Sequence, residues 1–296
     1  MTGRADWGPW SQPCEGQAEA PALLDPDEAP PFEIINAEGM ANALLVCDHA
    51  SNRLPRRLGG LGLRRDQMQA HIAWDLGAAE VARGLAVRLD APLILSGYSR
   101  LVIDLNRPLG SPELIPAQSD GVKISGNQAL SPVARAARIA ALFLPYHRAI
   151  AQWLDAHPSP ELRLISLHSF TPRLAGQSRP WPIGLAYGRD PRLAHQLRRA
   201  LSGQADLLVG DNEPYGIEDS HDFTLTTHGE GRGISHVMIE IRQDGLQTQV
   251  QVDAWVERLA QAYSRIDERP PGEPTCEGAS QPGQPQRSWR IMQIGR

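Results

Sequence analysis

Short apolar runs alternate along the chain with longer segments in which apolar residues recur every three or four positions. The longer segments cover residues 78–89, 133–144 and 252–263, and their spacing predicts helices with one apolar face. Ser131 and Pro132 have the form of a helix N-cap followed by proline, and Pro145 predicts a kink or a break. The apolar runs predict strands at residues 42–47, 92–96, 100–104, 162–167, 183–187, 206–209 and 235–241. Such alternation is typical of an α/β layered fold.

The two ends of the chain differ in composition from the middle. Residues 1–32 are rich in Pro and Gly and contain six acidic residues against one arginine, and residues 267–296 are again rich in Pro and Gly. Segments of this kind bury too little apolar surface to fold, so we expect both to be disordered tails. The sequence therefore predicts a single α/β domain over residues 33–266.

The overall charge disfavours some classes of partner. The 296 residues include 29 Lys and Arg against 34 Asp and Glu, a net charge of −5, with no basic cluster, so we expect neither nucleic acid nor anionic membrane as a partner. No signal-peptide core and no membrane-spanning apolar stretch is evident, and we expect a cytoplasmic protein. The cysteines, Cys14, Cys47 and Cys276, are too scattered for a disulfide framework or a paired metal-binding spacing.

One carboxylate stands in a segment that otherwise reads as a buried strand. Glu240 has apolar neighbours on both sides within residues 235–241. An ionised side chain is costly to bury without a partner, so Glu240 should pair with a cation, keep its proton, or serve chemistry. The structural alternative is a salt bridge to Arg242 or Arg100.

Two histidines lie at the ends of predicted strands. His49 follows the apolar run 43–47, and His168 follows residues 162–167. Open α/β sheets bind ligands at the carboxyl ends of their strands, and two imidazoles that meet there form a candidate metal site. A single strand-end histidine is more often a hydrogen-bonded structural residue, so the hypothesis depends on the pair and on Glu240 together.

Polar residues cluster between the predicted elements. The clusters are residues 48–55, 71–75, 98–108, 146–147, 166–172, 211–215 and 227–233. Over residues 33–265 this series resembles the N-formylglutamate amidohydrolase family. The resemblance implies a hydrolase of N-acyl amino acids that uses one zinc ion or another divalent metal. It also implies a fold similar to those of the metallocarboxypeptidases and aspartoacylases, a three-layer αβα arrangement around a mixed, mostly parallel sheet.

The resemblance implies roles for particular residues. His49 and His168 would bind the metal, and Glu240 would be the catalytic base. Metallocarboxypeptidases carry a metal-binding carboxylate three residues after the first histidine, but Asn52 stands there in this chain and is a poor zinc ligand.

Two aspartates remain as candidates for the third ligand. Asp75 is preferred, because it stands in a Trp-Asp pair that resembles the amidohydrolase pattern, although it could instead cap the helix at 78–89. Asp48 is less favoured, because its side chain should point to the opposite strand face from His49.

Substrate recognition is expected to involve carboxylates, for which the two-pronged guanidinium of arginine is suited. The candidate residues are Arg107, Asn106, Arg100, Arg232, His228 and Tyr215. Arg107 is the first choice, because the resemblance implies that Asn106 and Arg107 correspond to the Asn-Arg pair that grips the substrate carboxylate in metallocarboxypeptidase-like enzymes. Arg100, Asn106 and Arg107 could equally anchor a loop. His228 lies in a glycine-rich loop that could close over the site. The alternative for both His228 and Tyr215 is that they are ordinary turn residues without contact to substrate.

The leading hypothesis is a zinc-dependent hydrolase that cleaves the amide bond of an N-formyl or other small N-acyl amino acid, with N-formylglutamate as the first guess. One alternative is a deacylase or peptidase for a different N-acyl amino acid on the same scaffold. The other is a carboxylate-binding protein without catalytic activity. Fold similarity alone does not separate these alternatives.

Overall fold

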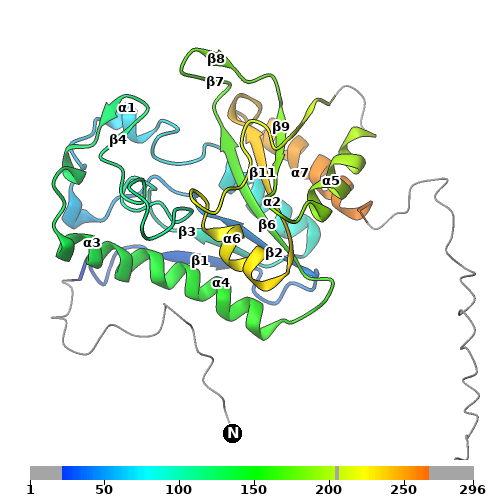
Figure 1. Ribbon diagram of the computed structural model, residues 1–296, viewed down its shortest axis with the longest axis horizontal. Helices are drawn as coiled ribbons and strands as arrows, with labels where there is room; N and C mark the ends of the chain where they lie inside the picture. Colours follow the sequence, from blue (N-terminus) through cyan, green and yellow to red (C-terminus); the bar gives the residue numbers. More distant parts are fainter. Residues whose placement is uncertain (1–21, 204–206, 267–296) are drawn as a thin grey trace, which may run out of the picture. The chain divides into compact units, whose positions relative to one another are not determined.

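The computed structural model describes residues 22–203 and 207–266, which form a layered structure around one central sheet (Figure 1). The strands of this sheet are β1 (Phe32–Ile35), β2 (Ala43–Cys47), β3 (Leu93–Ser96), β6 (Arg163–Phe170), β9 (Ile183–Ala186), β10 (Val209–Asp211) and β11 (Ser235–Arg242). They are ordered β1-β3-β2-β6-β11-β9-β10. The pairs β1–β3 and β11–β9 are antiparallel and the other pairs are parallel. The predicted mixed, mostly parallel sheet is confirmed.

Helices cover both faces of the sheet, because successive side chains of each strand point to opposite faces. Leu45 of β2 belongs to the core beneath α2 (Ala78–Leu89), α5 (Arg192–Ser202) and α7 (Gln249–Ser264). Leu44, its neighbour, belongs to the other core, which includes α4 (Leu144–Ala156). Figure 1 shows α4 running along the opposite face from α5 and α7. The predicted three-layer αβα arrangement is therefore confirmed.

The helix predictions are mostly confirmed, with one error at Pro145. Helix α3 (Pro132–Arg138) begins at Ser131, whose hydroxyl accepts a hydrogen bond from the Ala134 amide (3.2 Å). A single π turn (Ile139–Phe143) then joins α3 to α4 without a break. The helix continues through Pro145, so the predicted break is wrong, and the local distortion of the helix is the π turn directly before this proline. Helices α5, α1 (Arg65–Met68) and α6 (Thr224–His228) were not predicted from spacing.

The strand predictions are confirmed for β2, β3, β6, β9 and β11. The strand predicted at residues 100–104 is wrong, because this segment is a buried turn in which the Val102 amide donates to the Ser99 carbonyl (2.9 Å). Its apolar side chains are buried as expected, but an apolar run does not distinguish a strand from a buried turn. The strand predicted at 206–209 corresponds to β10, which begins three residues later and ends two residues later; residue 206 lies outside the described residues. The edge strand β1 was not predicted.

The domain begins before the predicted residue 33. Leu23 is buried, and the Arg57 guanidinium donates to the Asp25 carboxylate (2.7 Å) and to the Ala22 carbonyl (2.7 Å). The segment 22–32 therefore packs on the domain and is not a disordered tail. The rest of both predicted tails lies outside the described residues. No helix in the described part of the chain is long and apolar enough to cross a membrane. Short hairpins are formed by β4 (Gln118–Ser119) with β5 (Val122–Lys123) and by β7 (Arg173–Leu174) with β8 (Gln177–Ser178).

Two buried histidines connect α4 with α6. Nδ1 of His147 lies 3.2 Å from Nε2 of His228, and Nε2 of His147 donates to the Leu105 carbonyl (2.9 Å). Burial lowers the pKa of His147 to about 4 and holds the pKa of His228 well below its usual value. Both side chains are therefore neutral in the folded protein at pH 7.

We expect the free energy of unfolding to decrease as the pH is lowered from about 6.5 to about 4. Because the pKa of His147 is lower in the folded protein than in the unfolded chain, the unfolded state binds more protons in this window and is favoured. Below about pH 4 the folded protein binds the proton too, and the effect saturates. The shift corresponds to roughly 3 kcal/mol for this one group. Urea unfolding at stepped pH, with chelator present, measures the effect.

A variant without the titrating group provides the comparison. His147→Gln should unfold at lower denaturant concentration but lose less of its stability across the same pH window. His157→Gln, changed at an exposed position after α4, should keep the wild-type slope. Identical slopes in the His147 variant and the wild type would contradict the assignment.

Candidate metal and active site

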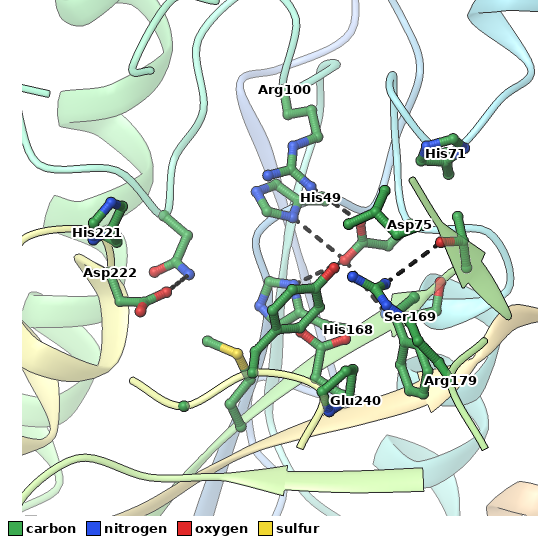
Figure 2. A pocket seen from close by; sticks show the side chains of 18 of the residues that line it. His49, His71, Asp75, Arg100, His168, Ser169, Arg179, His221, Asp222 and Glu240 are labelled. Carbon is green, nitrogen blue, oxygen red and sulfur yellow. Dashed lines mark hydrogen bonds and ion pairs between the residues drawn. The ribbon is translucent and has the colours of Figure 1, made fainter. Parts of the chain in front are cut away.

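The site lies at the carboxyl ends of three neighbouring parallel strands, β2, β6 and β11. His49 follows β2, and His168 of β6 pairs in register with Glu240 of β11. Strands in this order bring residues that are distant in sequence to one edge of the sheet. Figure 2 shows the side chains of His49, Asp75, His168 and Glu240 in the same pocket. The spatial convergence that the sequence hypothesis required is present.

Three side chains place potential metal-binding atoms within 4.8 Å of one another: His49, Asp75 and His168. Oδ2 of Asp75 lies 3.3 Å from Nδ1 of His49 and 2.8 Å from Nδ1 of His168. All three residues are buried. Two imidazoles and one carboxylate are a known ligand set for catalytic zinc, which leaves room for water and substrate.

The Nε2 atom of each imidazole, on the side of the ring away from Asp75, contacts a second carboxylate. Nε2 of His49 lies 2.8 Å from Oδ1 of Asp104, and Nε2 of His168 lies 3.1 Å from Oδ2 of Asp48. A carboxylate in this position fixes the orientation of the imidazole and favours the proton on Nε2, which leaves the Nδ1 lone pair available. Asp48 therefore contacts the second histidine from behind, on the opposite side from the potential metal-binding atoms. Asp104 was not identified from the sequence.

The electrostatics of the site fit a divalent cation. Burial and the nearby Arg100 cation act to lower the pKa of His49, but the carboxylates of Asp104 and Asp75 outweigh them and raise it. Burial likewise opposes the charge of His168, yet Asp48 and Asp75 raise its pKa well above the usual value. The carboxylates thus favour positive charge at the two imidazoles, and a divalent metal at the Nδ1 atoms would supply positive charge there without a proton.

Asp75 has the orientation expected of a ligand and not that of a helix cap. Helix α2 begins after Gly77, and no side chain caps its first amides. The Asp75 amide donates to the His49 carbonyl (3.0 Å), which holds the two residues together. The left-handed backbone of Gly77 (φ 78°) permits the turn from this contact into the helix, and a Cβ there would collide with Leu246. The capping alternative is therefore contradicted.

Glu240 is buried, and its Oε2 atom has no hydrogen-bond partner among the described residues. Burial raises its pKa to about 7, although the neighbouring His168 acts to lower it. Arg242 instead pairs with Asp244 (2.8 Å), and Arg100 pairs with Asp104 (2.6 Å) and Asp75 (3.5 Å). The salt-bridge alternative for Glu240 is therefore not observed. A carboxylate with a pKa near neutrality beside a metal site is suited to proton transfer.

The pocket above these groups has a volume of about 490 Å³. Among the predicted substrate residues, it is lined by Arg100, Asn106, Arg107 and Tyr215. Asn106 anchors the start of α6, because its Nδ2 donates to Asp222 (2.9 Å) and its Oδ1 accepts from the Phe223 and Thr224 amides (3.0 Å each). Its polar groups are thus already bound, as the loop-anchoring alternative expected.

Arg107 lines the pocket but is held by protein groups. Its guanidinium contacts the carboxylate of Glu113 (3.2 Å) and donates to the His221 carbonyl (3.0 Å), and Asp222 lies 3.9 Å away. Arg107 therefore reaches the pocket with much of its charge compensated.

The structure does not bring His228 and Arg232 to this pocket. His228 is buried against His147, and Arg232 forms an ion pair with Asp155 of α4. Neither residue lines the pocket. His228 is the last residue of the short helix α6, and Arg232 lies in the 3-10 turn that follows it. The expectation of substrate contact for these two residues is corrected.

Arg179 lines the pocket but was not identified from the sequence. Arg179 follows β8 at the base of the β7–β8 hairpin, and its guanidinium stacks on the ring of Tyr215 at 4.7 Å. It lines the pocket and is labelled in Figure 2. No spacing pattern marks it, since its position in the pocket depends on the hairpin folding back over the end of β6.

Comparison with known proteins agrees with this geometry. The family model described as N-formylglutamate amidohydrolase matches residues 41–247. The chain is 36% identical to the gene product Atu2144 from Agrobacterium tumefaciens, with a TM-score of 0.78, over 83% of this chain and 100% of the other. An N-formylglutamate amidohydrolase from Ralstonia eutropha JMP134 has 19% identity and a TM-score of 0.61, over 80% of this chain and 97% of the other. No protein with a curated function matches.

The family match covers well over half of the chain and includes His49, His168, Glu240 and the three aspartates of the site, Asp48, Asp75 and Asp104. The resemblance inferred from the polar clusters is therefore confirmed, and the chain belongs to the N-formylglutamate amidohydrolase family.

Proposed function

We propose that this protein is a metal-dependent amidohydrolase that removes a formyl or other small acyl group from the nitrogen of an amino acid, with N-formylglutamate as the first candidate substrate. The observation that supports it best is the group formed by His49, Asp75 and His168 beside the unpaired Glu240. The family match supports amide hydrolysis as the class of reaction. Zinc is the first candidate metal, because two imidazoles and a carboxylate suit it.

The proposed division of labour follows from the geometry. His49, Asp75 and His168 would hold the metal, while Asp104 and Asp48 fix the imidazoles. A divalent ion at this position supplies Lewis-acid polarisation of the scissile carbonyl and makes a water molecule more acidic.

Glu240 would take the proton from the attacking water and deliver it to the departing amine. In the metal-free protein burial raises its pKa to about 7, and a carboxylate that holds its proton more tightly than usual is the stronger base for the water proton. Its Oε2 atom has no protein partner in the described structure and is therefore free to serve.

A substrate panel with and without chelator tests the proposal. We expect the purified protein, loaded with zinc, to hydrolyse N-formyl amino acids and to lose this activity on chelation, because the metal supplies several kcal/mol of transition-state stabilisation. The panel should contain N-formyl and N-acetyl forms of glutamate, glutamine, histidine and alanine, with release of the free amino acid as the readout.

The alternatives give different results on the same panel. Faster cleavage of larger N-acyl groups or of dipeptides would favour a deacylase or peptidase. Failure to bind metal in stoichiometric amount, with no hydrolysis after zinc addition, would overturn the proposal in favour of a carboxylate-binding protein.

A further inference from the structure

Arg179 is a buried cation without an acidic partner. The residue is only 9% exposed, and no carboxylate within residues 22–203 and 207–266 lies within ion-pair distance of its guanidinium. The hydrogen bond that its guanidinium makes is to a neutral group, from Nη1 to the Thr171 hydroxyl (3.4 Å). A charge that is largely removed from water needs a partner, and here the protein does not provide one.

The other two arginines of the pocket differ in this respect. Arg100 is paired with Asp104 (2.6 Å) and Asp75 (3.5 Å), and Arg107 is paired with Glu113 (3.2 Å). The positive charge of Arg100 and Arg107 is therefore compensated by carboxylates of the protein itself. Arg179 is thus the arginine of this pocket whose charge remains available for a ligand.

The guanidinium is held in place by its surroundings. The backbone amide of Arg179 donates to the Pro172 carbonyl (2.9 Å), and its own carbonyl accepts from Arg242 (3.0 Å). The guanidinium carbon lies 4.7 Å from the ring centroid of Tyr215 and 5.7 Å from that of Phe170. Stacking on aromatic rings fixes the guanidinium plane and uses none of its N–H groups. The hydrogen bond to Thr171 engages Nη1, so Nε and Nη2 remain able to bind a carboxylate with two hydrogen bonds.

We propose that Arg179, stacked on Tyr215, is the receptor for a free carboxylate of the amino-acid part of the substrate. Arg107, the first choice from the sequence, then serves mainly to position the loop that carries His221 and Asp222. This inference rests on the proposed function, because it assumes that the pocket binds an N-acyl amino acid. It deepens that function by assigning the group that selects anionic over neutral substrates.

The test compares substrates that differ only in charge. We expect the wild type to prefer N-formylglutamate over at least one of its two monoamides, N-formylglutamine and N-formylisoglutamine, in kcat/KM. In Arg179→Gln this preference should decrease by about 30-fold or more, which is the scale for removing one partner of a buried, hydrogen-bonded charge pair. The monoamide whose kcat/KM rises relative to that of N-formylglutamate identifies which carboxylate Arg179 binds. A ratio of substrates does not depend on the fraction of the variant that is folded.

Two further variants control the experiment. Arg179→Lys keeps the charge but lacks the two-pronged geometry, and its preference should lie between those of the wild type and Arg179→Gln. Arg173→Gln changes an exposed arginine of the same hairpin that does not line the pocket, and it should keep the wild-type preference. Equal losses on the acid and on both amides in Arg179→Gln would overturn the proposal, because the residue would then act at the reacting carbonyl or on the fold.

A binding measurement separates this inference from the proposed function. Calorimetric titration of the zinc-loaded protein with L-glutamate should give an affinity about 30-fold or more weaker in Arg179→Gln than in Arg173→Gln. If the wild type hydrolyses no compound of the panel but this difference in affinity is found, the proposed reaction fails and the assignment of Arg179 stands. If Arg179→Gln bound glutamate as tightly as Arg173→Gln, the assignment of Arg179 would be refuted, whatever the activity of the protein.

Discussion

Glu240→Gln should lower kcat by about 10² to 10⁴-fold on the best substrate of the panel, while metal binding is retained. The amide has nearly the shape of the carboxylate but cannot accept the proton of water, and general acid–base catalysis contributes a factor of this size. Glu240 is not one of the three grouped metal-binding residues, so its replacement should leave the metal content unchanged. Steady-state kinetics together with metal analysis of the dialysed protein measure both quantities.

The comparison variant for this experiment is Glu80→Gln, in which an exposed glutamate of α2 is changed. It should retain both the turnover and the metal content of the wild type. Wild-type kcat in Glu240→Gln would exclude the residue as the base. Loss of metal from Glu240→Gln would show that the side chain belongs to the ligand set, and the division of labour proposed above would then be wrong.

His168→Ala should abolish stoichiometric metal binding and lower kcat/KM by at least about 10³-fold. The imidazole supplies one of the three grouped ligand atoms, and the metal is proposed to supply several kcal/mol of transition-state stabilisation, where each 1.4 kcal/mol is a factor of ten. Metal content by mass spectrometry after dialysis and zinc titration with a competing chelator are the direct readouts. The rate of N-formylglutamate hydrolysis measures the loss of activity.

Asp48→Asn provides a graded comparison. Its carboxylate contacts the far nitrogen of His168 (3.1 Å) and does not reach the metal-binding atoms, so its loss should weaken zinc affinity only by about 10 to 100-fold. His157→Ala removes an exposed histidine after α4 and should leave zinc affinity unchanged. If His168→Ala still bound one zinc ion with wild-type affinity, the proposed metal centre would be refuted.

Much of the fold could be predicted from local patterns. The apolar faces of α2 and α7 recur with the period of a helix, and β2, β6 and β11 are short apolar runs at the spacing of an α/β sheet. These patterns exist because one face of a helix or both faces of a central strand must be buried, and each buried position requires an apolar residue. The pattern fails at residues 100–104, where an apolar run is buried in a turn, and at β1, an edge strand with half its residues exposed.

The meeting of His49, His168 and Glu240 could also be foreseen. Each residue lies within or just after a strand, and parallel neighbouring strands bring their carboxyl ends to one edge of the sheet. This is a property of topology, so strand-end position made these three side chains candidates, and the resemblance to the amidohydrolase family implied their roles. The same argument excluded Asp48 from the metal face, since neighbouring residues of an extended segment point in opposite directions.

The partners of the charged residues were beyond the reach of the sequence. Arg100 is engaged by Asp75 and Asp104, His168 by an aspartate 120 residues away, and Arg232 by α4, whereas Arg179 has no acidic partner in the described chain. Whether an arginine is free for a ligand depends on which carboxylates the fold brings within about 4 Å of it, and no periodicity along the chain carries that information. Hydrophobic patterning thus accounts for the layers and for the edge where the site forms, and only the packed structure decides which charges remain for the substrate.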